Sequence, residues 1–119
     1  LDGGLLVEVL KRRELFSLGC VVTLRYLGGL RRDHALDWKL IIDSIGENVA
    51  LCAGGSVDIL NELAGHSDQN IRLIAKSGVV KFIFFTYLFS TFGDKFNLYK
   101  ALRLIRAVST IDKGVIRER

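Results

Sequence analysis

The fold of this chain is decided by residues 60–92, which read LNELAGHSDQNIRLIAKSGVVKFIFFTYLFSTF. The stretch predicts the end of one helix, a polar turn, a short amphipathic helix at 69–76 and a Ser-Gly stop. A long helix follows at 79–92 and is apolar on almost every side. A helix that is apolar all round must be covered by its neighbours, so flanking helices are expected to enclose it. Its large apolar side chains are therefore expected to be nearly inaccessible: Phe82, Phe85, Leu88 and Phe89.

The composition predicts one intracellular globular domain. The chain has 119 residues, of which half are apolar and a quarter charged, which is near the average for a globular chain and enough for one core. Cys20 and Cys52 lie in apolar surroundings and are expected to be reduced, buried thiols rather than a disulfide. The first residues do not resemble a secretion signal, and residues 79–92 are too short to cross a bilayer. We expect a protein of the cytoplasm or an organelle interior, without a transmembrane segment. The sequence lacks an initiator Met, so we expect a fragment, a processed product or a chain that lacks its first residues. The single helical domain at 1–119 is expected to be a fragment of, or close to, a longer array of helices.

The spacing of apolar residues outside the central stretch predicts further helices and no confident strand. They are expected at residues 5–11, 15–27, 35–45, 47–64 and 95–111. The inward face of the second is expected to hold Leu18, Val21, Val22 and Leu27. In the last helix the inward face is expected to hold Leu98, Ala101, Leu102, Ile105 and Val108, with Lys100, Arg103 and Arg106 on the opposite arc. The chain is predicted to be all-α.

Gly54 and Gly55 are the weak point of the helix expected at 47–64, because each interior glycine costs about 1 kcal/mol relative to alanine. Either the pair allows close packing against a neighbour, or the chain breaks there into two shorter helices. We expect a continuous or kinked helix.

An internal repeat organises these helices. Three times a shorter apolar helix is followed by a longer one, and the longer members end near Leu27, Ala64 and Val108, which are 37 and 44 residues apart. This spacing brackets the roughly 40-residue period of two- and three-helix solenoids. Since one pair cannot bury both of its faces, the pairs are expected to stack.

Residues 63–80 resemble the junction between two armadillo repeats. The match consists of Leu63-Ala64-Gly65, four further residues, and then Asn70-Ile71-Arg72-Leu73-Ile74-Ala75-Lys76-Ser77-Gly78-Val79-Val80. Asn70, Gly78 and Val80 fall on the most typical positions, whereas the proline that often opens the second helix is absent and Lys81 follows instead. Armadillo and HEAT repeats are not separated by this match, and a generic helical domain with the same apolar pattern is the alternative.

The resemblance implies a right-handed α-solenoid that serves as a binding scaffold. In armadillo arrays the third helices line a concave surface, where asparagine side chains hold the backbone of a ligand. Carried over to this chain, that role falls to Asn48, Asn61 and Asn97, with Lys100, Arg103 and Arg106 beside the last. The competing interpretation is that these polar residues are only the solvated faces of their helices.

The charge distribution points to an acidic partner. Residues 95–119 hold seven Lys or Arg and two acidic residues, so their net charge is +5, whereas residues 1–94 carry −1. One-sided basicity suits an acidic protein surface or peptide, an anionic lipid or RNA. We rank an acidic protein partner first and expect a non-catalytic scaffold or structural subunit of a larger complex. The alternative is an RNA-binding or membrane-peripheral subunit of an organellar complex.

The sequence carries no motif of an enzyme, a cofactor site or a metal site. A glycine-rich phosphate loop, a His-Glu zinc pair and a Gly-x-Ser-x-Gly turn are all missing. The Asp33-His34 pair and residues 66–68 contain catalytic residue types, but both lie at helix junctions, where such residues are ordinary turn and cap formers.

Overall fold

The computed structural model describes residues 3–29, 37–88 and 95–111, and all regular structure in these ranges is helical. This confirms the all-α prediction for the described part of the chain. The elements are α1 (Gly3–Lys11), η1 (Arg13–Leu15), α2 (Phe16–Gly28), α3 (Trp38–Asn48), η2 (Val49–Leu51), α4 (Ala53–Ala64), α5 (Asp68–Ser77), α6 (Val79–Leu88) and α7 (Lys95–Ile111), where η denotes a short 3₁₀ turn.

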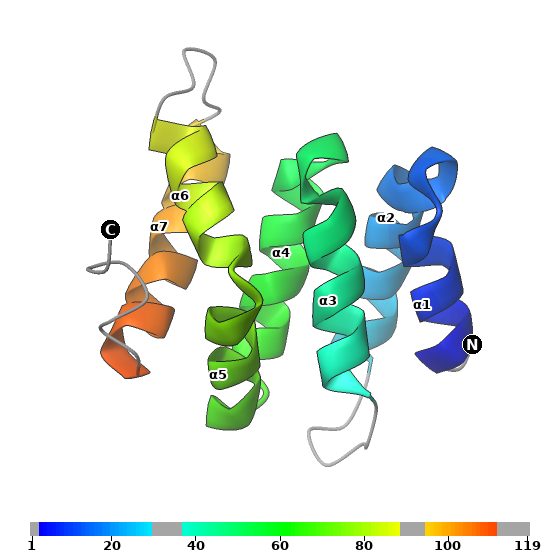
Figure 1. Cartoon of the computed structure of the whole chain (residues 1–119), viewed down its shortest axis with the longest axis horizontal. Helices are drawn as coiled ribbons and strands as arrows, with labels where there is room; N and C mark the ends of the chain where they lie inside the picture. The colour runs from blue at the N-terminus through cyan, green and yellow to red at the C-terminus, as the bar shows by residue number, and fades with distance from the viewer. Residues whose placement is uncertain (1–2, 30–36, 89–94, 112–119) are drawn as a thin grey trace.

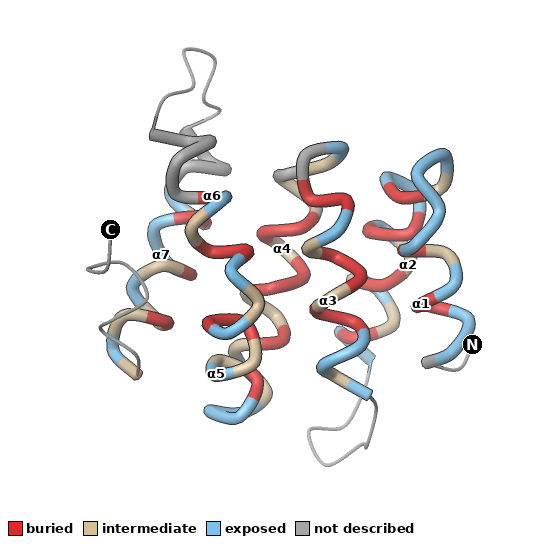
Figure 2. The backbone as a smooth tube through the Cα atoms, in the orientation of Figure 1, coloured by how far each residue is buried: buried red, intermediate tan, exposed pale blue. Residues whose placement is uncertain are grey.

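The helices lie in two layers (Figure 1). One layer contains α1, α3, α5 and α6, and the other contains α2, α4 and α7. Within the layers α1 packs on α3 and α3 on α5, while α2 packs on α4 and α4 on α7. Contacts of α1 with α2, and of α7 with α5 and α6, join the layers. Buried residues recur between exposed ones along α1 to α5 and α7 (Figure 2), so these helices are amphipathic where their side chains are described, and the core lies between them.

The junction between α4 and α6 forms as its sequence predicts. The Ser67 hydroxyl accepts a hydrogen bond from the Asn70 backbone N–H at 3.2 Å, which caps α5. The buried Asn70 amide donates to the Leu63 carbonyl at 3.1 Å, and this bond satisfies a backbone oxygen at the end of α4. Gly78 then takes a left-handed conformation with φ 78°, which ends α5 and allows α6 to begin at once.

The expected continuous or kinked helix at 47–64 is wrong, and the break lies before Gly54 and Gly55 rather than at them. Helix α3 continues through Gly46 to Asn48, and the chain makes a 3₁₀ turn before α4 begins after Cys52. The buried Asn48 amide explains the break, because it donates to two carbonyls at the end of α1, Leu10 at 3.0 Å and Lys11 at 3.4 Å. Such bonds fix the end of α3 beside α1.

Gly55 allows the close packing that was one of the two expected roles of the glycine pair. A Cβ atom at this position would lie 2.9 Å from Cys52 Sγ and 3.0 Å from Cys20 Cβ. Both distances are shorter than ordinary van der Waals contacts, so a larger residue would push α2 and α4 apart.

The buried face of α2 differs from the prediction. Leu18 and Val21 are 61% and 55% exposed, and the residues turned inward are Phe16, Gly19, Cys20, Thr23 and Leu27. The small residues determine which side of α2 faces the core. A Cβ atom at Gly19 would lie 2.9 Å from Val9 Cγ1, so α1 packs closely against α2 at this glycine because glycine has no side chain.

Two further apolar side chains are placed differently from the prediction. Phe82 is 42% exposed rather than enclosed, because its side chain lines a surface hollow. Leu102 is also exposed, and Leu104 takes its expected place in the core with Ala101 and Val108. The expected burial of Phe85, Leu88 and Phe89, and of Leu98, concerns side chains outside the described residues.

The two cysteines are free thiols that lie near the same glycine, and they are expected to react at different rates. Burial, and secondarily the neighbouring Cys52 thiol, raise the pKa of Cys20 from 9.0 to about 12. Because the thiolate is the nucleophile, we expect iodoacetamide at pH 8 to alkylate the half-buried Cys52 much faster than Cys20. Peptide mass mapping over time measures both rates, and urea-unfolded protein is the control in which both thiols react. Equal rates in the folded protein would contradict the burial of Cys20.

Candidate binding surface on α4 and α7

A hollow of about 280 Å³ lies where α2, α4 and α7 meet. Its wall on α2 is the side chain of Leu24, and its other lining residues are Asp58, Asn61, Glu62, Lys100 and Arg103. The hollow therefore brings together α4 and α7, which the sequence predicted to be the binding helices, and it mixes both signs of charge.

Polar contacts from Lys100 hold α7 against α4. Its ammonium group lies 2.7 Å from the Asp58 carboxylate, and the two side chains are only 29% and 27% exposed. The Asn61 amide donates to the Lys100 backbone carbonyl at 3.0 Å. The expectation that Lys100 lies on the solvent side with Arg103 and Arg106 is therefore wrong. Its charge is paired with that of Asp58, so Lys100 joins α7 to α4.

The outer face of α7 carries a stripe of four residues that form a second hollow of about 220 Å³. The stripe consists of Tyr99, Leu102, Arg103 and Arg106, which are spaced so that they share one side of a helix. Tyr99 is 67% and Leu102 52% exposed, and both arginines are exposed as well. We call these four residues the α7 stripe. Arg103 also lines the first hollow, so the two hollows form a continuous surface.

The chemistry of the α7 stripe suits a ligand that is both acidic and apolar. An arginine guanidinium presents a planar set of donors that binds a carboxylate through two parallel hydrogen bonds. Tyr99 offers an aromatic surface and Leu102 an aliphatic one, and exposed apolar groups with a polar rim are typical of interaction sites. A carboxylate at the arginines would thus bring its neighbouring side chain onto the apolar half of the stripe.

The asparagines of the expected site are placed differently from one another. Asn61 lies in the first hollow, with its N–H group already bonded to α7. Asn48 is buried in the other layer, where it holds the end of α1. The side chain of Asn97 lies outside the described residues. Leu102 was not predicted as a surface residue. The apolar spacing placed it in the core, where the structure has Leu104 instead.

The potential metal ligands among the described residues are dispersed. Among them, no group of three or more His, Cys, Asp or Glu side chains is placed to hold a metal ion. His66 lies in the turn before α5, with its ring 5.5 Å from that of Trp38, centroid to centroid. This contact gives the imidazole a packing role at the helix junction.

Two further findings concern membrane-spanning helices and similarity to known proteins. In the three described ranges no helix combines the length and the apolar character that a membrane span requires. No protein-family model, no curated protein and no solved structure matches this chain.

Proposed function

We propose that this chain is a non-catalytic protein-binding scaffold, built as a right-handed solenoid of stacked helical pairs of the armadillo type. The observation that carries the proposal is the α7 stripe, in which two arginines adjoin an exposed tyrosine and leucine. The solenoid arrangement is supported by the two parallel rows of packed helices. It is also supported by the Asn70 bond to the end of the preceding helix, at the position where the sequence resembles an armadillo junction.

The partner in this proposal is an acidic protein segment with apolar side chains between its acids. The carboxylates pair with Arg103 and Arg106, while an apolar side chain rests on Tyr99 and Leu102. The net charge of +5 on residues 95–119 attracts such a segment and speeds its association. As a scaffold of this kind, the chain serves as a structural subunit of a multi-protein complex in the cell.

RNA is the second candidate ligand, because one observation favours it. Tyr99 is exposed beside two arginines, and aromatic side chains on basic surfaces stack with nucleobases. The adjoining hollow disfavours it, since the Glu62 carboxylate lines this hollow together with Arg103 and would repel a phosphate group. A peptide can place a neutral residue there, whereas every nucleotide carries a charge.

Selection of peptides from a random display library on the immobilised chain tests the proposal. We expect enrichment of peptides in which Asp or Glu adjoins Leu, Phe or Trp, with binding that weakens moderately as salt rises because charges contribute. A parallel titration with single-stranded RNA of mixed sequence tests the second candidate. Enrichment of peptides that lack acidic residues would contradict the proposal. Tight RNA binding with a steep salt dependence would replace it with the second candidate.

A further inference from the structure

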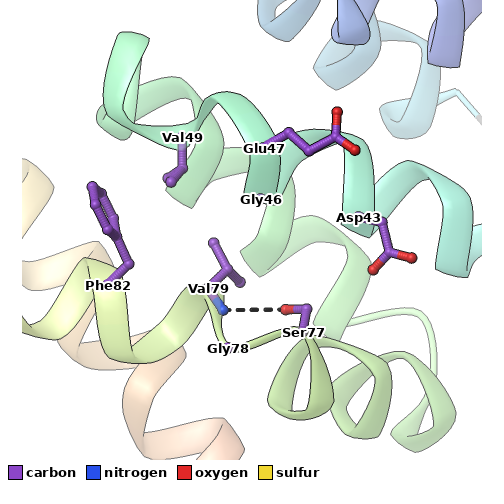
Figure 3. A pocket seen from close by; sticks show the side chains of 8 residues that line it. All are labelled: Asp43, Gly46, Glu47, Val49, Ser77, Gly78, Val79 and Phe82. Carbon is purple, nitrogen blue, oxygen red and sulfur yellow. Dashed lines mark hydrogen bonds between the residues drawn. The ribbon is translucent and has the colours of Figure 1, made fainter.

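A larger hollow, of about 490 Å³, lies in the other layer, between α3 and the junction of α5 with α6 (Figure 3). Helix α3 and η2 supply Asp43, Glu47 and Val49, and the first turn of α6 supplies Val79 and Phe82. None of these residues lines the two hollows on α4 and α7. It is therefore a separate site, which the proposed function does not use.

The hollow exists because the chain bends at Gly78. Helix α3 packs along α5, but after the left-handed glycine α6 packs on α5 and α7, so the side of α3 that carries Asp43 and Glu47 borders the hollow. The hollow has free space beside a glycine on each of its two sides. Apart from its own neighbours along the chain, neither Gly46 on α3 nor Gly78 has a heavy atom within 4 Å of the place where a Cβ atom would lie.

The two ends of the hollow differ in chemistry. Figure 3 shows Val49, Val79 and Phe82 at one end and the side chains of Asp43 and Glu47 toward the other. Val49 and Val79 are buried and form an apolar floor, while Phe82 remains partly exposed above it. The two carboxylates are four residues apart, so they lie on the same side of α3.

The carboxylates are accessible to a cation. Asp43 pairs with Lys39 at 2.8 Å on the surface of the same helix, and such exposed pairs are weak enough to be exchanged. Glu47 is exposed, and within the described ranges no ion pair involves it. The carbonyl end of α3 adds partial negative charge here. At the facing start of α6, the Val79 N–H already donates to the Ser77 hydroxyl at 3.3 Å, so one donor that could attract an anion is occupied.

We propose that this hollow docks a segment of a partner protein that carries a lysine or arginine beside an apolar side chain. The cation lies between Asp43 and Glu47, and the apolar side chain covers Val49, Val79 and Phe82. The charge of the site selects the partner, because an acidic segment would be repelled by the two carboxylates. The scaffold thus holds two partners of opposite charge on its two layers.

A subtractive peptide selection tests this inference. A random display library is selected on the wild-type chain after depletion on the variant Gly46→Trp, whose indole would occupy part of the hollow and obstruct it. The substitution leaves the helix intact, because Gly46 lies within α3 and its Cβ position is open. We expect the remaining pool to be enriched in peptides with Lys or Arg beside Leu, Ile or Phe. A selected peptide should bind at least tenfold more weakly to Gly46→Trp and to Glu47→Lys.

Two controls separate this site from folding defects and from the α7 stripe. Gly28→Trp introduces the same side chain at another helical glycine with open space, and it should bind the peptide like the wild type. Arg103→Glu combined with Arg106→Glu should also leave this binding unchanged, so failure of one site does not imply failure of the other. Enrichment without basic residues, or equal binding by Gly46→Trp, would overturn the inference. It would also be overturned by a dimer, detected by sedimentation, that Gly46→Trp dissociates, because the occupant would then be a second copy of this chain.

Discussion

Replacement of Phe16 by alanine is expected to lower the free energy of unfolding by about 3–5 kcal/mol. Phe16 opens α2 and is completely buried in the main core, which includes residues of α1, α3 and α4. Truncation removes apolar contacts and leaves a cavity that the surrounding helices can only partly fill. Since small domains unfold at a total cost of about 5–15 kcal/mol, the variant should be close to unfolding at 37 °C. Urea denaturation followed by circular dichroism measures the change.

Leu18→Ala is the matched control, because it truncates a large apolar residue of the same helix. Leu18 is 61% exposed, so the free energy of unfolding should change by less than about 0.5 kcal/mol. The pair tests the rotation of α2 about its axis. A larger loss for Leu18→Ala than for Phe16→Ala would mean that α2 turns its other side to the core, as apolar spacing alone predicted.

The junction at residues 63–80 could be predicted from sequence because its signals are local. A serine before α5 and a glycine after it are residues that favour caps for reasons within one helical turn. The end of α3 could not be predicted in this way. The bonds from Asn48 reach carbonyls 37 and 38 residues away in α1, and local spacing contains no information about such a contact.

The surface residues were hardest to predict where a helix is apolar on more than one side. In α7 both Leu102 and Leu104 fit a helical pattern, and only the packing against α4 and α5 decides that Leu104 is buried. In the same way, Lys100 has the spacing of an exposed arginine, but Asp58 of α4 draws it into an ion pair. The basic character of the last helix was predictable from composition, whereas the charges available to a partner required the structure.

Reversal of both arginines of the α7 stripe is the second large effect that we expect. Arg103→Glu combined with Arg106→Glu should weaken binding of a selected acidic peptide at least tenfold, which corresponds to about 1.4 kcal/mol or more. Carboxylates of the peptide would then meet like charges instead of guanidinium groups. Folding should be nearly unchanged, because both side chains are exposed. Lys100 is left in place, since a glutamate there would face the half-buried Asp58.

Arg25→Glu combined with Arg72→Glu is the control for total charge. These arginines are exposed on α2 and α5, and neither lines the hollows on α4 and α7. Each reversal changes the charge by two, so both double variants have a formal net charge of zero instead of +4. If the affinity falls only because the long-range attraction is weaker, the loss should be equal in the two double variants.

Fluorescence anisotropy of one labelled acidic peptide, titrated with the wild type and the two double variants, tests the binding role of the α7 stripe most directly. We predict at least a tenfold higher Kd for Arg103→Glu/Arg106→Glu and no more than a threefold change for Arg25→Glu/Arg72→Glu. Equal affinities of all three proteins, or the greater loss in the Arg25/Arg72 variant, would contradict the claim that this stripe binds the partner.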